Sequence, residues 1–369
     1  MTDLLQGAVT ILLFLAILGV TVVLHELGHF VVARLAGVRV LEFGIGFPPR
    51  ARVLRDEGGT VYTLNWLPIG GFVKMEGEDG GSADDPRSFT AKPIGIKALI
   101  LVAGVAMNFL LAFVIFTGIT LTGDPAIGVT VPYVEPGSPA ATAGLVAGDV
   151  VERVDGEAFG AFGAITILDE LRANAGRTVT LHVRHAGGSS SEVTATLRTA
   201  AEIAGGKGAL GIGRAGNPVQ LRTTEDRIRY PAGDAVRLGW DRTVGATRLI
   251  FAGVGEILSD IVNRPTEPPA AAGPVGIATQ IGDVFWTLGP VITLYLAGVL
   301  SANLAVINIL PFPPLDGGRL VVLVIKRVLG NRLSLRAERL TYFVGFAVLF
   351  AFLIWVTAFD VVRQLGGIP

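Results

Sequence analysis

The chain has 369 residues, of which 51% are hydrophobic and only 17% are charged, against about 25% charged residues in soluble domains. It contains no cysteine, which excludes disulfides, a thiolate nucleophile and a zinc site with Cys ligands. The formal net charge is −1, so nothing in the charge balance indicates a nucleic-acid partner. This composition indicates a membrane protein, with the lipid bilayer as a partner.

Four apolar segments predict membrane-spanning helices, because each has roughly the twenty apolar residues that a bilayer requires. They lie at about residues 7–36, 97–122, 285–310 and 340–359. No cleaved signal peptide is expected, since the opening residues "MTDLLQG" carry no Lys or Arg and no A-x-A site follows the apolar run.

Lys and Arg residues gather in two of the segments that connect these spans. Because such residues mark the cytoplasmic ends of spans, we expect both loops in the cytoplasm, and both termini and residues 123–285 outside. The first loop contains Arg34, Arg39, Arg50, Arg52, Arg55, Lys92 and Lys97, and the second contains Lys326, Arg327, Arg332, Arg336 and Arg339.

The first loop predicts β structure at about residues 42–76. "ARVLRDEGGTVYTLNWLPIGGFVKMEG" indicates two strands around a turn at Gly58 and Gly59. Its apolar character indicates that the hairpin lies against the membrane domain. "EGEDGGSADDPRS" then predicts a flexible acidic loop.

The outside segment begins with a small β-rich domain at residues 126–215. Alternating apolar residues from Val129 predict a strand, which is followed by a short Ala-rich helix, a turn at Gly148–Asp149 and a second strand. "TVTLHVRHAGG" and "SEVTATLRT" predict a hairpin. His182 and His185 have no acidic partner in a motif, so we interpret them as surface residues.

Residues 216–284 change character. Apolar residues at helical intervals, interrupted by charges, predict one or two amphipathic helices at about 232–262 on the outer surface. "NRPTEPPAAAGP" predicts a Pro-rich linker into the third span.

The first span ends in the sequence HELGH, which is an HExxH motif formed by His25, Glu26 and His29. On a helix, residues i and i+4 share one face, so both imidazoles can bind one zinc ion, with Glu26 beside them to take a proton from a bound water. The alternative is that the histidines hydrogen-bond to neighbouring helices. Three ionisable groups within five residues of a span demand a compensating partner, which favours zinc.

A catalytic zinc of this kind needs a third protein ligand and an open position. The best candidate is Asp316 in "NILPFPPLDGGRL", where prolines 311, 313 and 314 break the third span. The alternative is an ordinary helix-ending Asp-Gly-Gly turn. HELGH and this turn both fall at cytoplasmic span ends in the predicted topology, so the two can meet.

The chain resembles the site-2 protease family, the intramembrane zinc metalloproteases of bacterial regulated intramembrane proteolysis. The resemblance rests on "HELGHF", "EFGIGFPPR", "LPIGGFVKMEGE", "RSFTAKPIGIKALILVAGVAMNFLLA", "GPVGIA" and "NILPFPPLDGGRL", in family order. It implies that His25, His29 and Asp316 bind zinc and that Glu26 is the general base. Asn308 would help hold substrate or the developing oxyanion, with helix packing as the alternative. Asn108 in "AGVAMNF" matches a family position too, although interhelical hydrogen bonding also accounts for it.

The resemblance also implies a membrane-dipping sheet, formed by "GIGF" and the hairpin around residues 65–73, whose edge holds the unwound substrate. Asn65, Gly70, Gly71 and Phe72 would contact that substrate. The implied substrates are single-span membrane proteins already cleaved outside, such as anti-sigma factors or remnant signal peptides. The implied location is the bacterial cytoplasmic (inner) membrane, with the active site near the cytoplasmic face.

"SPAATAGLVAGDVVERVDGEAF" resembles a bacterial PDZ domain, which binds extended peptide at a sheet edge. Several family members carry two such domains in tandem, whereas this chain has room for one. The predicted fold class is a polytopic α-helical membrane protein of about four transmembrane helices, with a membrane-associated β-hairpin or sheet and one extracytoplasmic PDZ domain of α+β type. The predicted domains are 1–125, 126–215, 216–284 and 285–369.

Two other functions compete with a peptidase. A non-catalytic membrane adaptor would recruit partners through the PDZ domain, but Glu26 is present, which disfavours it. A zinc transporter would need more polar residues through the later spans. Serine and aspartyl intramembrane proteases are disfavoured, because neither a GxSG nor a GxGD element occurs.

Overall fold

The computed structural model describes residues 2–78, 84–163, 165–214, 216–264, 271–329 and 335–365. Parts of the predicted acidic loop and of the Pro-rich linker, and Arg332, lie outside these residues. The chain divides into two compact units. The helical unit is Met1–Phe116, Gly239–Asp283 and Tyr295–Pro369, and the sheet unit is Thr117–Leu238 and Val284–Leu294.

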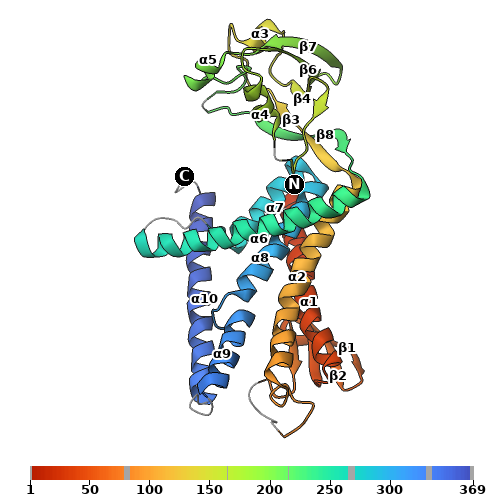
Figure 1. Ribbon diagram of the computed structural model, residues 1–369, viewed down its shortest axis with the longest axis vertical. Coiled ribbons are helices and arrows are strands. Elements are labelled where there is room, and N and C mark those ends of the chain that lie inside the picture. The colour runs from red at the N-terminus through yellow and green to blue at the C-terminus, as the bar shows by residue number, and fades with distance from the viewer. Residues whose placement is uncertain are drawn as a thin grey trace. The chain divides into compact units, whose positions relative to one another are not determined.

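Among the described residues, four helices are long and apolar enough to cross a membrane (Figure 1). They are α1 (Thr2–Leu35), α2 (Ile94–Thr122), α8 (Pro290–Ile309) and α10 (Leu335–Gln364). Each is rich in Leu, Ala, Val, Ile or Phe and has no internal proline, so no backbone hydrogen bond is lost to proline inside the bilayer. The four predicted spans are therefore present as helices, which fits a multi-pass membrane protein.

The third span begins later than predicted. Residues 285–288 belong to a separate helix, α7 (Pro274–Leu288), which ends at Gly289 with a φ of +84°. Glycine adopts this left-handed conformation at little cost, and Pro290 then starts α8 at the position where a missing N–H is harmless. The prediction of one span over 285–310 is therefore wrong at its start, because the Gly-Pro pair breaks the helix.

The predicted hairpin is present as β1 (Val40–Glu57) and β2 (Thr60–Met75), joined at Gly58 and Gly59 with φ values of +61° and +79°. Both strands are long and bent. Residues 42–45 of β1 pair with 61–64 on one side and with 71–74 on the other. Residues 50–57 pair with 60–65. The resulting sheet has the order 71–75, 40–45, 60–65, 50–57, so that residues 71–75 form one of its edges.

The two halves of this sheet differ in burial. Val40, Phe43 and Val73 belong to a buried apolar cluster with α1 and α2 residues, including Ala33 and Ile100. The other half exposes apolar side chains, with Trp66 71% accessible. The sheet is therefore anchored to the helices through the half that includes the 71–75 edge, and its other half presents an apolar surface, as the prediction of a membrane-associated hairpin requires.

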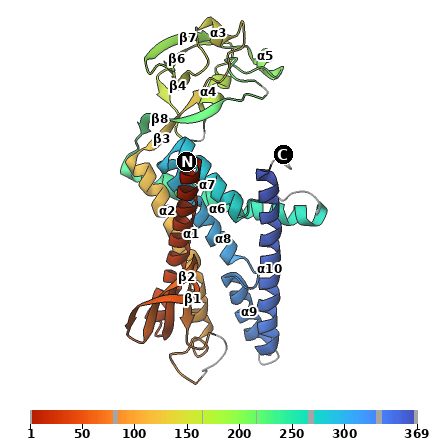
Figure 2. The same ribbon diagram turned by 180° about the vertical axis from the view of Figure 1, so that it is seen from behind.

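The helical unit contains further helices besides the four long apolar ones. The proline cluster separates α8 from α9 (Asp316–Leu329), as predicted. Lys326 of α9 pairs with Glu338 of α10, and Figure 2 shows these two helices side by side. The amphipathic segment is one helix, α6 (Ala232–Asn263), which carries charged residues between its apolar ones.

The sheet unit is built on strands in the order β7-β6-β4-β3-β8, of which β8 (Gln220–Ile228) is the last in the chain. The predicted first strand is β3 (Asp124–Thr130), and the predicted second strand is β4 (Val150–Val154), which pairs with β3 and with a short β5 (Glu157–Ala158). The predicted hairpin is β6 (Thr178–Arg184) and β7 (Ser190–Thr196). Alternating buried residues of these strands form the core, as period-2 patterning requires.

Within its described residues, the sheet unit also contains three short helices. The predicted Ala-rich helix is α3 (Pro139–Thr142), and the sequence did not predict α4 (Ile167–Ala173) or α5 (Ala200–Ala204). Both α4 and α5 begin with a capping box, in which a threonine and an acidic residue three positions later satisfy each other's backbone N–H groups.

Strand β8 (Gln220–Ile228) lies where the sequence predicted only helices and a linker. It pairs with β3, and Asp226 accepts two hydrogen bonds from the Arg153 guanidinium on β4, at 2.7 and 2.8 Å. The boundary predicted at residue 215 is therefore wrong, because the sheet continues to Ile228. Most residues of β8 are exposed or half-buried, so its sequence lacks the alternating apolar pattern that identifies a strand.

His182 and His185 have acidic partners that the sequence did not reveal. His185 Nδ1 lies 3.1 Å from the Asp149 carboxylate, and His182 Nδ1 lies 3.6 Å from that of Glu152. Both imidazoles are about one-third exposed. They are surface residues, as interpreted, but pairing of β4 with β6 gives each an acidic partner that is 30 or more residues away in the chain.

Because β8 pairs with β3, we expect a fragment of the sheet unit to fold alone only if it includes β8. A fragment of residues 122–230 should unfold cooperatively on heating, followed by circular dichroism. A fragment of 126–215 should not, since β3 loses its neighbour and each lost backbone hydrogen bond costs about 1 kcal/mol. Equal melting temperatures for the two fragments would show that β8 is dispensable.

Candidate metal centre

Helices α1 and α2 meet backbone to backbone beside the HExxH motif. A Cβ at Gly28 of α1 would lie 2.4 Å from the Ala103 carbonyl oxygen of α2. A Cβ at Gly104 of α2 would lie 2.4 Å from His29 Nε2 and 2.8 Å from His25 Cε1. Only glycine fits at either position, because real Cβ atoms do not approach other atoms this closely. The two glycines therefore let the backbone of α2 lie against both imidazoles.

Glycines also position Asp316, which is the first residue of α9. A Cβ at Gly317 would lie 2.1 Å from the Ile309 carbonyl oxygen, and one at Gly318 would lie 2.5 Å from the Phe312 carbonyl carbon. The start of α9 is therefore packed directly on the end of α8 and the proline turn. The predicted alternative, a helix-ending turn, does not describe Asp316, which begins a helix.

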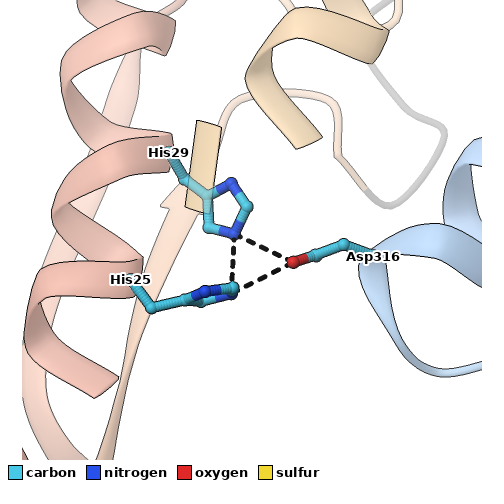
Figure 3. A group of neighbouring side chains, drawn as sticks. All are labelled: His25, His29 and Asp316. Atoms are coloured by element: carbon cyan, nitrogen blue, oxygen red, sulfur yellow. Dashed lines mark hydrogen bonds and ion pairs between the residues drawn. The ribbon is translucent and has the colours of Figure 1, made fainter. Parts of the chain in front are cut away.

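The three predicted ligand residues converge (Figure 3). Asp316 Oδ2 lies 3.0 Å from His25 Nε2 and 3.3 Å from His29 Nε2. The two Nε2 atoms lie 3.2 Å apart. Both histidines are buried, and burial alone would raise the pKa of Asp316, but the hydrogen bonds with His25 and His29 hold it well below its ordinary value. The carboxylate is therefore ionised and faces two nitrogen atoms.

This donor set fits zinc. Donors of a tetrahedral zinc ion with bonds of about 2.0–2.1 Å lie about 3.3 Å apart, close to the separations between these three atoms. Two imidazole nitrogens and one carboxylate oxygen match the ligands of catalytic zinc sites, which leave a fourth position open. Within the described part of the chain, no other group of three His, Asp or Glu side chains converges in this way.

The second nitrogen of each imidazole contacts α2. His29 Nδ1 lies 2.8 Å from the carbonyl oxygen of Ile100, which can only accept, so this nitrogen carries the proton and leaves Nε2 free as a ligand. His25 Nδ1 lies 3.1 Å from the Asn108 carboxamide. Ile100, Gly104 and Asn108 follow at intervals of four, so one face of α2 serves both histidines.

The donors lie in a cavity of about 530 Å³. Glu26 lines it beside the histidines, is half-buried, and accepts no hydrogen bond from the described residues. The cavity walls come from α1, α8, α9 and the 70–75 edge of the sheet. Its remaining lining is largely apolar and includes Leu18, Val22, Phe47, Leu101 and Leu304.

Four of the five predicted substrate-binding residues line this cavity, namely Gly70, Gly71, Phe72 and Asn308. Asn65 does not. The residue is 4% exposed, and its side chain donates a hydrogen bond to the backbone carbonyl oxygen of Gly46 in β1 at 3.0 Å. The structure thus places Asn65 behind the sheet edge rather than in the cavity.

The sequence did not identify Glu78 and Arg319, which also line the cavity. They form an ion pair between the end of β2 and α9, one turn after Asp316. Burial alone would lower the pKa of Arg319, but the adjacent Glu78 raises it above its ordinary value. Glu78 also accepts a hydrogen bond from the Met75 backbone N–H at 3.2 Å. Both residues lie in sequence motifs that carry the family resemblance, but nothing in the spacing of these motifs indicates that the two side chains pair.

Comparison with known proteins assigns the family. The profile of Peptidase family M50 matches residues 13–352. The chain belongs to Peptidase family M50. This confirms the resemblance to site-2 proteases at the level of the family, and the M50 chain is accordingly a zinc metalloprotease.

Curated relatives agree with this assignment over nearly their whole length. A protein of Clostridium perfringens whose name describes a zinc metalloprotease is 32% identical over 345 residues, covering 92% of this chain and 95% of its own. One of Agrobacterium fabrum with a similar name is 29% identical and covers 96% of both chains. The zinc metalloprotease RasP of Geobacillus kaustophilus is 26% identical, covering 95% of this chain and 97% of RasP.

The glycine contact on α2 gives a direct test of the site. Gly104→Ala should remove most bound zinc, because the added Cβ would displace both imidazoles. Gly118→Ala on the same helix is the matched control, since its Cβ would meet nothing within 4 Å. Zinc content of the purified full chain, measured by mass spectrometry, checks both. Normal zinc in Gly104→Ala would contradict the packing of α2 on the ligands.

Proposed function

We propose that this M50 metalloprotease hydrolyses a peptide bond within the transmembrane segment of its substrate. The observation that carries the proposal is the shared cavity, into which three zinc-type donors and Glu26 open. Its walls include α1 and α8, both long and apolar enough to span a membrane. A substrate that reaches this cavity would do so from the bilayer.

His25, His29 and Asp316 would hold the zinc ion, which when bound polarises a scissile carbonyl and activates water at neutral pH. The Glu26 carboxylate, which has no hydrogen-bond donor among the described residues, would take the proton from the attacking water. It would then return this proton to the leaving amine nitrogen. Asn308, on the cavity wall near the end of α8, would donate from Nδ2 to the oxygen on which negative charge develops.

The 71–75 edge of the sheet would bind the substrate backbone. In the described residues, β pairing occupies only one side of this segment, so its outer N–H and C=O groups are open to another strand. Gly71 borders Glu26, since a Cβ there would lie 3.5 Å from Glu26 Cγ. An unwound substrate added at this edge would present its carbonyl groups to the cavity, whereas a helical substrate keeps them hydrogen-bonded.

The substrates we propose are single-span membrane proteins already shortened outside, such as anti-sigma factors or remnant signal peptides. The enzyme would lie in the bacterial cytoplasmic membrane, with the HExxH end of α1 near the cytoplasm. The basic residues of the loops that flank α1, α2, α9 and α10 support this orientation.

We propose further that the β-rich part of the sheet unit, from β3 to β8, is a PDZ domain that binds extended peptide outside the membrane. A cavity of about 140 Å³ lies between α4 and residues 208–212, lined by apolar side chains that include Leu168, Leu171, Leu210 and Ile212. This arrangement suits a peptide strand with an apolar side chain. A non-catalytic adaptor would need this groove but not the buried donors, so the donors favour the peptidase.

The role of Glu26 is tested with Glu26→Gln in the purified chain, reconstituted in vesicles with a single-span substrate. Cleavage should fall by a factor of about 100 or more, because proton transfer by a positioned group contributes roughly that much. Zinc content should stay normal, since Glu26 is not a proposed ligand. Undiminished cleavage with zinc bound would exclude Glu26 as the base.

The sheet edge is tested with Gly71→Val. The branched side chain would fill the space between the edge and Glu26, so kcat/KM should fall at least about tenfold, equivalent to about 1.4 kcal/mol. Zinc content should not change. Gly19→Val on α1 is the matched control, because a Cβ there meets nothing within 4 Å. Equal kcat/KM for the two variants would contradict substrate binding at this edge.

A further inference from the structure

Asn108 makes an incomplete set of contacts at the metal site. It lies on α2, is fully buried, and places its Nδ2 3.1 Å from His25 Nδ1. Its Oδ1 is buried without a hydrogen-bond partner among the described residues. Leaving a buried acceptor unpaired costs about 1–3 kcal/mol, so this carboxamide calls for an explanation.

The tautomer of His25 supplies that explanation. A carboxamide N–H pointed at Nδ1 requires Nδ1 to accept, which puts the imidazole proton on Nε2. That proton then faces Asp316 Oδ2, 3.0 Å away, and Nε2 has no lone pair for a metal. If the carboxamide turns by half a rotation, Oδ1 faces Nδ1 and accepts its proton. Nε2 then carries the lone pair, and Oδ1 takes the place of Nδ2 as the paired atom of the carboxamide.

His29 does not depend on such a choice. Its Nδ1 faces the Ile100 carbonyl oxygen, which cannot donate, so the neutral imidazole carries its lone pair on Nε2. His25 is thus the one proposed imidazole ligand whose ligating nitrogen depends on a side chain that can present either a donor or an acceptor.

We propose that Asn108 is a positioning residue that selects the metal-binding tautomer of His25 by accepting its Nδ1 proton on Oδ1. The same carboxamide, turned over, supports the opposite tautomer, in which His25 donates to Asp316 while no metal is bound. This inference rests on the ligand set of the proposed function. Partners of this kind change metal affinity by about 10- to 100-fold when they are removed.

Helix packing is the competing role for Asn108, and the structure separates the two. The Asn108 backbone oxygen accepts a hydrogen bond from Ser301 Oγ of α8 at 2.8 Å. Ser301→Ala therefore removes an α2–α8 contact at the same residue without touching the carboxamide. Asn108→Leu removes the acceptor and keeps the size, and Asn108→Asp keeps the acceptor oxygen in place.

Zinc affinity of the full chain in detergent, measured by competition with a chromophoric chelator, tests the proposal. Asn108→Leu should weaken binding about 10- to 100-fold, whereas Asn108→Asp and Ser301→Ala should bind zinc nearly as the parent chain does. Unchanged affinity in Asn108→Leu would overturn the proposal. Equal losses in Asn108→Leu and Asn108→Asp, or in Asn108→Leu and Ser301→Ala, would assign Asn108 to packing instead.

A second measurement needs no variant of Asn108. The chain has only four histidines, so nitrogen-15 NMR of labelled histidine can assign the protonated nitrogen of each. In the zinc-loaded chain, His25 should carry its proton on Nδ1, and finding it on Nε2 would refute the inference together with ligation through Nε2. His25→Ala tests the ligand set separately from the role of Asn108. Undiminished zinc affinity in this variant would show that His25 is not a zinc ligand.

Discussion

Gly28 of α1 and Gly104 of α2 bring two helix backbones into direct contact at the level of the imidazoles. Because neither residue has a side chain, α2 can offer a backbone carbonyl at Ile100 and a carboxamide at Asn108 to the inner nitrogens of the histidines. A larger residue at either position would separate the helices and withdraw both groups. The orientation of the two imidazoles, and through it any metal chemistry, therefore depends on this contact.

Helix α2 also packs closely against α8. Phe116 of α2 is fully buried against α8, where a Cβ at Gly298 would lie 2.6 Å from its ring. Ser301 of α8 bonds to the Asn108 backbone, and α8 leads through the proline turn to Asp316. Helix α2 thus fixes the distance between the histidines on one side and the aspartate on the other. His25 and Asp316 are 291 positions apart. They can converge because α2 contacts both α1, which carries the histidines, and α8, which leads to Asp316.

Features that depend on local sequence could be predicted. The spacing of His25, Glu26 and His29 fixes their common helix face, and the proline cluster fixes the break before Asp316. The turn at Gly58–Gly59 follows from residues that tolerate a positive φ. In each of these cases the physical cause lies within a few residues, so the pattern in the chain carries the information.

Features that depend on pairing between distant segments could not be predicted. Strand β8 has no alternating pattern of its own, and it is a strand because β3 offers an open edge. His185 meets Asp149 only after β4 and β6 pair. The family resemblance implies that Asn65 contacts substrate, but its side chain donates to the Gly46 carbonyl oxygen within the sheet. The start of α8 differs from these cases because its cause is local. The Gly-Pro break lies inside an apolar run, and hydropathy alone predicts one continuous helix there.

Electrostatic balance links the metal to the fold. Glu78 and Arg319, which both line the cavity, compensate each other's charge. The Asp316 and Glu26 carboxylates line the same cavity, where a divalent cation would compensate both. An ionised group in a low-dielectric environment is stable only when it is paired or bound to a metal. The charges that make HELGH unusual in an apolar helix are therefore consistent with the fold when they are considered with Asp316 and zinc, because the cluster as a whole is then close to neutral.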